Sequence, residues 1–475
     1  MKTTNHLLKN RYLDSVTLMR VSRRVAALPG VAAASLMIGT PANKALLAEA
    51  GLLAAEGEAA GPDDLIIALR AADAAAAFAA AGAILLEKAE GAADLPRTRS
   101  LAAAAQLLPQ ATLAVISVPG AFAAHEARRA LESGLNVLVF SDNVPLEDEV
   151  ALKRLAAEKG LLLMGPDCGT ALIAGTPVAF ANAVPRGDIG IVSASGTGLQ
   201  EVSSLIARLG GGVSQGIGVG GRDLDERVGA LGTLAALDAL EGDAATKKIV
   251  LISKPPAPAV ARKVLERVKR IAKPSVVCFL GFDGSTLTQA AEQATGKKLP
   301  ADKLDLKKTR GVIAGLFCGG TLCAEAEMIA GRGHRFVDLG GDEFTRGRPH
   351  PMIEPELRNE HVARALADPQ VGVILLDVVL GYGSHEDPAG VLTRNDLSSK
   401  LVIASVTGTE RDPQGYARQV ATLRAAGVVV AASNARAAEL AAQTVSGAAP
   451  RPHPRARPSP SNARPRRGAP ARRRR

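Results

Sequence analysis

The chain has 475 residues, which is too long for one hydrophobic core, and its composition excludes several classes of protein. No apolar run is long and uninterrupted enough to span a membrane, the first residues lack a secretory signal, and the four cysteines have no CxxC spacing. The net charge of +10 lies in a tail with ten arginines, and the remainder has 47 basic and 47 acidic residues. We therefore expect a cytoplasmic multidomain protein with reduced cysteines, no metal centre and no membrane partner.

Residues 1–95 are predicted to form a small α+β module. The stretch "SVTLM" is typical of a strand and "VSRRVAAL" of a helix. They are followed by the strand "VAAASLMIG", a helix from Pro41, the strand "GPDDLIIALR" and an alanine-rich helix from Ala71. Paired strand–helix–strand halves indicate a ferredoxin-like arrangement.

Residues 96–186 alternate apolar strands with amphipathic helices, as in "TLAVISVP", "AFAAHEARRALESG", "LNVLVFS", "PLEDEVALKRLAAEKG" and "LLLMG". This alternation predicts a doubly wound parallel sheet with both faces covered. Residues 187–300 and 301–445 repeat it, and we interpret 282–308 as the linker between them. The fold class is therefore α/β, with several Rossmann- or flavodoxin-like domains.

Residues 446–475 combine the ten arginines with seven prolines and no acidic residue. This composition cannot bury a core and predicts disorder. Such a tail could attract nucleic acid or anionic lipid, or it could be an extension without function.

Two matched turns lie between an apolar strand and a helix, in "GIVSASGTGLQEVSSLI" and "GVIAGLFCGGTLCAEAEMI". Unpaired amides and the dipole at a helix N-terminus favour a bound anion, and glycine permits close approach. The predicted phosphate-binding residues are Ser193, Ser195, Gly196, Thr197, Gly198, Gly319, Gly320 and Thr321. A tight turn with a helix cap would need the same residue types, so that interpretation stays open. Neither turn has the GxxxxGK[ST] or GxGxxG form, so direct ATP binding has little support.

Further candidates for substrate contacts lie at other predicted strand ends. Gly220, Gly221 and Arg222 follow "GIGV", and Lys254 ends "KKIVLIS". Arg346, Arg348 and His350 form a compact cationic group that could hold a carboxylate. Cys168, in "MGPDCGT", is interpreted as a packed thiol in preference to a nucleophile.

A family resemblance rests on longer phrases. "VPGAFAAHEARRALESGLNVLVFSDNVPLEDEV", "LMGPDCGTALIAG", "GIVSASGTGLQEV" and "SQGIGVGGRDL" resemble the α subunit of succinyl-CoA synthetase, in order. Residues 311–440 resemble the CoA-ligase domain of its β subunit. With "MIGTPANKALL" and "GRPHPMIEPELRN", the combination resembles the FdrA family of acyl-CoA-synthetase-like proteins.

The resemblance implies a CoA-binding-like domain at 96–186 and ligase-like domains at 187–300 and 301–445. It implies two helix N-termini that face one phosphate, and a substrate loop containing Gly381, Gly383 and Ser384. The sequence departs from the ligase pattern in three places. No histidine follows "KPSVVCFLG" where the ligase has its phosphohistidine, the first glycine-rich turn of the CoA-binding domain is missing, and there is no ATP-grasp domain. We therefore assign no catalytic residue.

The FdrA resemblance implies carbamoyl transfer between carbamoyl phosphate and oxamate in allantoin breakdown, by one subunit of a larger enzyme or by a homo-oligomer. Carbamoyl phosphate or CoA would then be a substrate, with no tightly bound cofactor. Two alternatives remain open at this point, an acid–CoA ligase and a non-catalytic scaffold.

Overall fold

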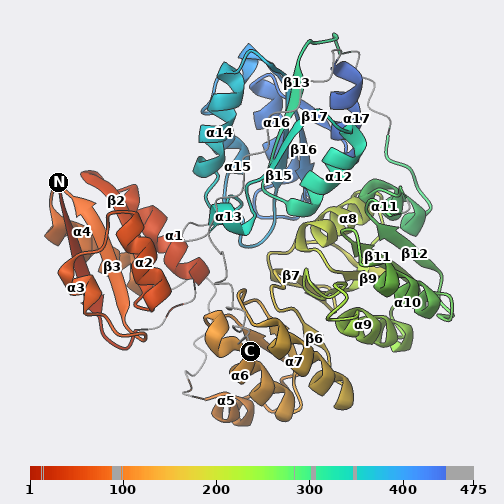
Figure 1. Ribbon diagram of the computed structural model, residues 1–475, viewed down its shortest axis with the longest axis horizontal. Coiled ribbons are helices and arrows are strands. Elements are labelled where there is room, and N and C mark those ends of the chain that lie inside the picture. The colour runs from red at the N-terminus through yellow and green to blue at the C-terminus, as the bar shows by residue number, and fades with distance from the viewer. Residues whose placement is uncertain are drawn as a thin grey trace, which may run out of the picture.

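The computed structural model describes residues 1–445 except 12, 14, 88–97, 99, 283, 301–305 and 346–349. Within these ranges the chain forms four sheets, each with helices packed against it (Figure 1). The tail and the predicted contacts of Arg346 and Arg348 lie outside the described residues. None of the helices in the described ranges combines the length and the apolar character needed to cross a bilayer.

The N-terminal module has an antiparallel sheet in the order β1-β3-β2. Its elements are β1 (Lys2–Leu8), α1 (Ser15–Ala26), β2 (Val31–Ile38), α2 (Pro41–Glu49), α3 (Ala55–Glu58), β3 (Leu65–Ala71) and α4 (Ala74–Leu86). The strand predicted at "SVTLM" is wrong, because this stretch begins α1. Leu18, Val21 and Val25 recur at helical spacing and are buried on one face of α1. The first strand is β1 instead, paired along its length with β3.

A small parallel sheet follows in the order β4-β5-β6. Its elements are α5 (Leu101–Leu107), β4 (Leu113–Ile116), α6 (Gly120–Glu132), β5 (Asn136–Val139), α7 (Leu146–Glu158) and β6 (Leu163–Met164). The next hairpin, β7 (Thr170–Ile173) and β8 (Thr176–Ala179), joins the following sheet instead. The sheet boundary therefore lies before residue 170, earlier than the predicted division at 186.

The third sheet has the order β12-β11-β9-β10-β7-β8, with β12, β11, β9 and β10 parallel. Its other elements are β9 (Arg186–Ser193), α8 (Gly196–Arg208), β10 (Val213–Gly218), α9 (Leu231–Gly242), β11 (Lys248–Ser253), α10 (Pro258–Val268), β12 (Ser275–Phe279) and α11 (Leu287–Thr295). Helix α11 lies inside the predicted linker at 282–308, so that prediction is wrong. Thr286 and Gln289 form a capping box that starts α11, and its apolar face is buried.

The fourth sheet is parallel in the order β14-β13-β15-β16-β17. Its elements are β13 (Val312–Phe317), α12 (Gly320–Ala330), β14 (Arg335–Asp338), α13 (Asp342–Thr345), α14 (Glu356–Ala367), β15 (Val371–Val379), α15 (Pro388–Leu392), the short 3₁₀ helix η1 (Leu397–Ser399), β16 (Leu401–Thr407), α16 (Tyr416–Ala425), β17 (Val429–Ala431) and α17 (Asn434–Thr444).

The third and fourth sheets share one plan, which confirms the doubly wound α/β fold. In each, the first parallel strand lies between the second and the third, so the direction of winding reverses at that point. Open α/β sheets bind ligands at the carboxyl ends of the strands beside such a reversal. Helices α8, α11, α12 and α17 of the two domains bury their apolar faces in one continuous core. The two sheets therefore meet with their first helices together (Figure 1).

Candidate functional site

The N-termini of α8 and α12 meet where the two domains face each other. Ser195 caps α8 by accepting a hydrogen bond from Gly198 N at 2.9 Å, and its hydroxyl lies 2.5 Å from that of Thr321 in α12. On the opposite side of the same contact, a Cβ on Gly319 would lie 3.0 Å from Cγ2 of Thr197. Each helix thus places its second residue, a threonine, against the cap position of the other.

A local two-fold relation extends along both helices. Glu201 is the sixth residue of α8, and Glu325 is the sixth residue of α12. Glu201 Oε1 accepts a hydrogen bond from Asn434 N at the start of α17, at 3.1 Å. Glu325 Oε1 accepts one from Leu287 N at the start of α11, at 2.6 Å. Each domain therefore supplies the carboxylate that caps the last helix of the other domain.

The geometry leaves backbone donors at the meeting point. Gly196, Thr197, Gly320 and Thr321 are the first residues of their helices, and their amides have no hydrogen-bond acceptor among the described residues. The helix dipoles add partial positive charge from both sides. This arrangement suits a tetrahedral anion between the helices.

Two predicted phosphate-binding residues build the α8 turn. The buried Ser193 hydroxyl donates to Ser195 O at 2.7 Å and accepts from Ser195 N at 3.1 Å. Gly198 packs against Ser195 and Ile252, leaving little room for a side chain. Ser193 and Gly198 therefore shape the loop.

Lys254 follows β11 and lies beside the N-terminus of α12. A Cβ on Gly320 would lie 2.9 Å from Lys254 Nζ and would overlap the carboxylate of Asp338. Burial raises the pKa of Asp338, while the positive charge of Lys254 lowers it. The glycine therefore leaves room for an exposed ammonium group at the helix end, as the predicted role of Lys254 requires.

Asp377, near the end of β15, is a site residue that the sequence analysis did not identify. It is fully buried, and its two oxygens accept hydrogen bonds from Cys318 N at 2.9 Å and Gly319 N at 2.8 Å. Arg358 of α14, also buried, pairs with it at 2.9 Å. The pair fixes the turn that leads into α12. The sequence feature that could have identified Asp377 is its position as the single charged residue within the apolar run "VILLDVV".

Of the predicted cationic group, the structure describes His350. Burial lowers its pKa to about 4, so it is neutral at pH 7. Its Nδ1 accepts a hydrogen bond from Met352 N at 3.1 Å, which places the proton of the neutral ring on Nε2. Nε2 lies against Gly340, two residues after β14. His350 can therefore donate a hydrogen bond near the α12 terminus but carries no charge there.

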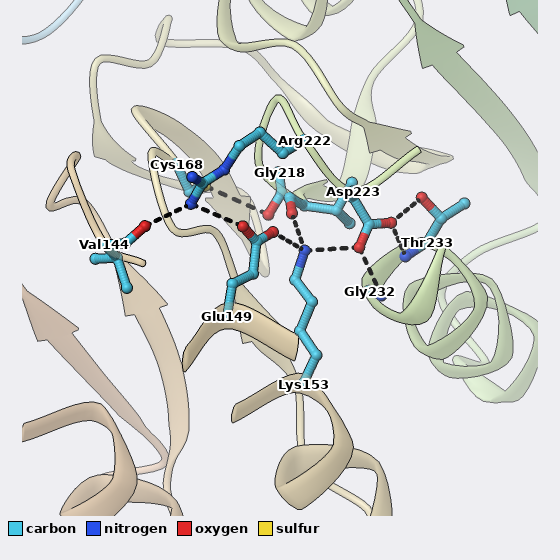
Figure 2. Close-up of polar contacts among 10 residues, drawn as sticks. Val144, Glu149, Lys153, Cys168, Gly218, Arg222, Asp223, Gly232 and Thr233 are labelled. Atoms are coloured by element: carbon cyan, nitrogen blue, oxygen red, sulfur yellow. Dashed lines mark hydrogen bonds and ion pairs between the residues drawn. The ribbon is translucent and has the colours of Figure 1, made fainter. Parts of the chain in front are cut away.

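Arg222 is occupied by contacts between domains (Figure 2). It pairs with Glu149 of α7 at 2.8 Å and donates to Val144 O at 2.9 Å. Glu149 also pairs with the buried Lys153 at 2.8 Å, and Lys153 pairs with Asp223 at 2.6 Å. Figure 2 shows these four charges as one chain of contacts that joins α7 to the turn after β10.

The same turn brings Gly220 and Gly221 close to residues 165–167. Gly220 has φ +88°, and a Cβ there would collide with Pro166 O. Asp223 accepts hydrogen bonds from Gly232 N and from both the amide and the hydroxyl of Thr233. The structure thus gives Gly220, Gly221 and Arg222 a framing position at the strand ends, and contact with substrate stays a prediction.

The predicted substrate loop after β15 is held firmly. Gly381 and Gly383 have φ +115° and +82°, and side chains there would press on Ala181 O and the Phe180 ring. Gly381 N donates to Gln414 Oε1 at 3.0 Å, and Gln414 Nε2 returns a hydrogen bond to Gly381 O at 2.9 Å. Ser384 lies at the end of this loop.

Cys168 behaves as a packed thiol, in agreement with the favoured interpretation. It is buried, its Sγ donates to Gly218 O at 3.3 Å, and burial raises its pKa to about 12. A thiol with so high a pKa is a poor nucleophile. Cys278, Cys318 and Cys323 are also buried.

The chain is similar to several known proteins and protein families. A family model described as CoA-ligase matches residues 316–445, and one described as AllF, heavy metal-associated domain, matches residues 1–99. The chain is 42% identical to the uncharacterized protein YahF of Escherichia coli, over 92% of this chain and 97% of that protein. It is 31% identical to a succinate–CoA ligase α subunit of Archaeoglobus fulgidus, over 30% of this chain and 50% of that one. An acetyl-coenzyme A synthetase from Ca. Korarchaeum cryptofilum overlaps 75% of this chain and 86% of its own, with 16% identity and a TM-score of 0.34.

The residues of the N-terminal module do not fit the metal that the second family description names. Heavy metals are held mainly by thiolate and imidazole groups. The first cysteine of the sequence is Cys168, and the module has one histidine, His6, on β1. In the described ranges, no three histidine, cysteine, aspartate or glutamate side chains are grouped so that they could hold a metal ion. The module's contribution must therefore be sought in other side chains.

Proposed function

This chain belongs to the FdrA family of acyl-CoA-synthetase-like proteins, and from that premise we propose that it transfers a carbamoyl group between carbamoyl phosphate and oxamate. In this proposal the chain acts together with further subunits or as a homo-oligomer. The AllF-type module at residues 1–99 supports a place in allantoin breakdown.

The observation that carries the proposal is the meeting of α8 and α12. The first two amides of each helix have no acceptor among the described residues, the hydroxyls of Ser195 and Thr321 meet between the helices, and the Lys254 ammonium group lies beside Gly320. Such an array stabilises a phosphate that is gaining negative charge as it leaves. An acyl phosphate arrives already activated, so no phosphohistidine is needed.

The proposed reaction has a simple balance. The amide nitrogen of oxamate attacks the carbonyl carbon of carbamoyl phosphate, and a C–N bond forms. The C–O bond to phosphate breaks, and inorganic phosphate leaves with the electron pair. The attacking nitrogen loses one proton, and the departing phosphate takes up one proton to become hydrogen phosphate. The two helix ends stabilise the departing oxygen as an oxyanion hole does.

The test follows the phosphorus NMR signal of carbamoyl phosphate, using the full chain purified with the proteins that co-purify with it. We expect oxamate-dependent conversion to inorganic phosphate. Thr197→Val and Thr321→Val each remove one hydroxyl and should lower kcat by about 10²–10³-fold. Thr295→Val, at the far end of α11, is the matched control and should keep the wild-type rate. Wild-type rates in both helix variants would contradict the proposed phosphate site.

An acid–CoA ligase is the second candidate, supported by the CoA-ligase match at residues 316–445. ATP, CoA and a small dicarboxylic acid in a parallel NMR sample would then give CoA-dependent ADP and phosphate. Turnover in neither sample, with a folded and fully assembled protein, would favour the scaffold alternative.

A further inference from the structure

A cavity of about 470 Å³ lies between the N-terminal module and the loop that follows β15. It is lined by Gly381, Gly383 and Ser384 with Gln414 and Arg418, and Arg20 of α1 also borders it. Residues far apart in the sequence therefore line one half-open space. Its size is within the range of small-molecule sites.

The loop side of the cavity is preformed. Tyr382 N donates to Ala181 O at 2.9 Å, and Gln414 Nε2 donates to His385 O at 3.1 Å as well as to Gly381 O. The hydroxyl of Ser384 is enclosed and has no hydrogen-bond partner within the described part of the chain. The loop thus holds one unpartnered hydroxyl group beside the cavity.

Two guanidinium groups border the cavity. Arg418 is fixed by its hydrogen bonds to Gln414 O at 2.9 Å and Glu386 O at 3.2 Å, both of them neutral carbonyl groups. Arg20 is exposed and forms no ion pair with any described residue. Neither positive charge is therefore neutralised by a direct carboxylate partner.

Two acidic residues also line the cavity, and both have other contacts. Asp387 caps α15 through Gly390 N and accepts a hydrogen bond from Gln419 at 2.9 Å. Glu386 lies 3.9 Å from Arg23, the residue of α1 three positions after Arg20. This second contact links α1 with the loop across an exposed surface.

The cavity lies on the same sheet edge as the two helix ends. Asp377 of β15 bonds to Gly319 at the cap of α12, and the strand reaches the loop four residues later. Gln200 of α8 donates to Leu380 O at 3.3 Å, immediately before Gly381. A ligand in the cavity would therefore lie on the same edge of the sheet as the proposed phosphate site.

We propose that this cavity binds the carboxylate of the acceptor and that Arg20, from the N-terminal module, is a specificity-determining residue of the acceptor site. The inference rests on the proposed function for the identity of the acceptor as a small carboxylate. The planar guanidinium group of Arg20 matches a carboxylate with two parallel hydrogen bonds. The N-terminal module would then contribute the positive charge of an arginine side chain to the site, in place of a bound metal ion.

The experiment compares Arg20→Gln with Arg24→Gln in the full chain. Arg24 lies on the same helix and pairs with Glu87 at 2.6 Å, so its loss removes the same charge away from the cavity. Binding of oxamate, oxalate, glyoxylate and succinate is measured by saturation-transfer NMR, and the KM values of oxamate and carbamoyl phosphate by turnover.

We expect Arg20→Gln to weaken binding of the preferred carboxylate, and to raise the oxamate KM, by about tenfold or more. The KM of carbamoyl phosphate should stay unchanged, and Arg24→Gln should resemble the wild type. Arg20→Lys, which keeps the charge without the fork, should recover part of the affinity.

The outcomes separate this inference from the proposed function. Carboxylate binding that depends on Arg20, without carbamoyl transfer, would support the cavity and contradict the proposed reaction. Carbamoyl transfer with an oxamate KM unaffected by Arg20→Gln would overturn the cavity assignment alone. The assignment would also be overturned if none of the four carboxylates bound to the wild-type chain.

Discussion

Single ionisable residues within otherwise apolar strands and helices fix the backbone around the candidate site. Asp377 and Arg358 are a buried pair, and their burial is tolerable because the carboxylate also accepts two backbone hydrogen bonds. Glu201 and Glu325 are also buried, and each accepts a hydrogen bond from the first backbone amide of a helix in the other domain. Several residues that fix the N-termini of α8, α11, α12 and α17 are therefore far in sequence from the two glycine–threonine turns.

Asp377→Asn should destabilise the protein, because it leaves the buried Arg358 charge without a partner. We expect the free energy of unfolding to fall by about 3–5 kcal/mol in urea denaturation. Asp368→Asn breaks the exposed pair with Arg335 and should have a small effect. Equal midpoints for the two variants would show that the buried pair contributes no stability.

Glu325 makes a specific contribution to the pH dependence of stability. Burial is the main cause that raises its pKa to about 7. Its folded-state pKa exceeds the ordinary value, so the native state holds this proton more tightly than the unfolded state does. The contribution to stability is complete below about pH 4.5 and is lost as the pH rises through 7.

The difference in unfolding free energy between wild type and Glu325→Gln should therefore change with pH. We expect it to shift by about 3 kcal/mol against the wild type between pH 4.5 and 7.5. Glu360→Gln, which removes an exposed partner of Arg364 on α14, is the control and should show a much smaller change. A difference that is constant with pH would contradict the raised pKa.

At the scale of the elements, Asn434 connects helices of both domains. Its backbone amide donates a hydrogen bond to Glu201 of α8. Its side-chain amide donates to Glu325 at 2.7 Å and to Leu322 O at 2.9 Å, both in α12. Helix α17 therefore begins at a point fixed by α8 and α12 together.

Asn434→Ala should cost about 1–3 kcal/mol of stability, because it leaves buried acceptors on Glu325 and Leu322 without their donor. Thermal and urea unfolding of the variant measure the loss. Asn395→Ala is a suitable control, since Asn395 donates only within its own turn, to Leu392 O. A loss no greater than that of Asn395→Ala would show that α17 is held by apolar packing alone.

Local patterns predicted many elements but not their partners. The alternation of apolar runs and amphipathic helices predicted the doubly wound sheets, and the two glycine–threonine turns predicted the cap positions of α8 and α12. The strand predicted at "SVTLM" failed because a short β-branched start resembles a strand until the buried positions Leu18, Val21 and Val25 are known. The linker prediction overlooked the capping pattern of Thr286 and Gln289.

The facing of the two domains could not be predicted, because it depends on contacts that span long stretches of sequence. Glu201 and Glu325 occupy the same position in two similar phrases, and this was a visible signal. Their partners, Asn434 and Leu287, become apparent only when the domains are packed together. Arg20 likewise has no local sequence feature that connects it with the loop at Gly381.

At the scale of the whole molecule, the net positive charge comes from the arginine tail, because the basic and acidic residues before it are equal in number. Truncation after Val445 removes ten arginines and leaves 47 basic and 47 acidic residues. We expect the truncated chain to lose most of its retention on heparin at low salt while its unfolding midpoint stays unchanged. Unchanged retention would locate the basic surface on the folded domains.

The two facing helices belong to one polypeptide, and this has a consequence for mass action. A site shared between separate subunits falls apart on dilution, whereas a tethered pair keeps a constant effective concentration. The α8–α12 junction should therefore persist at any protein concentration. If specific activity falls when the enzyme is diluted, the component that dissociates must be another chain, and the concentration at half-activity would measure how tightly that chain is held.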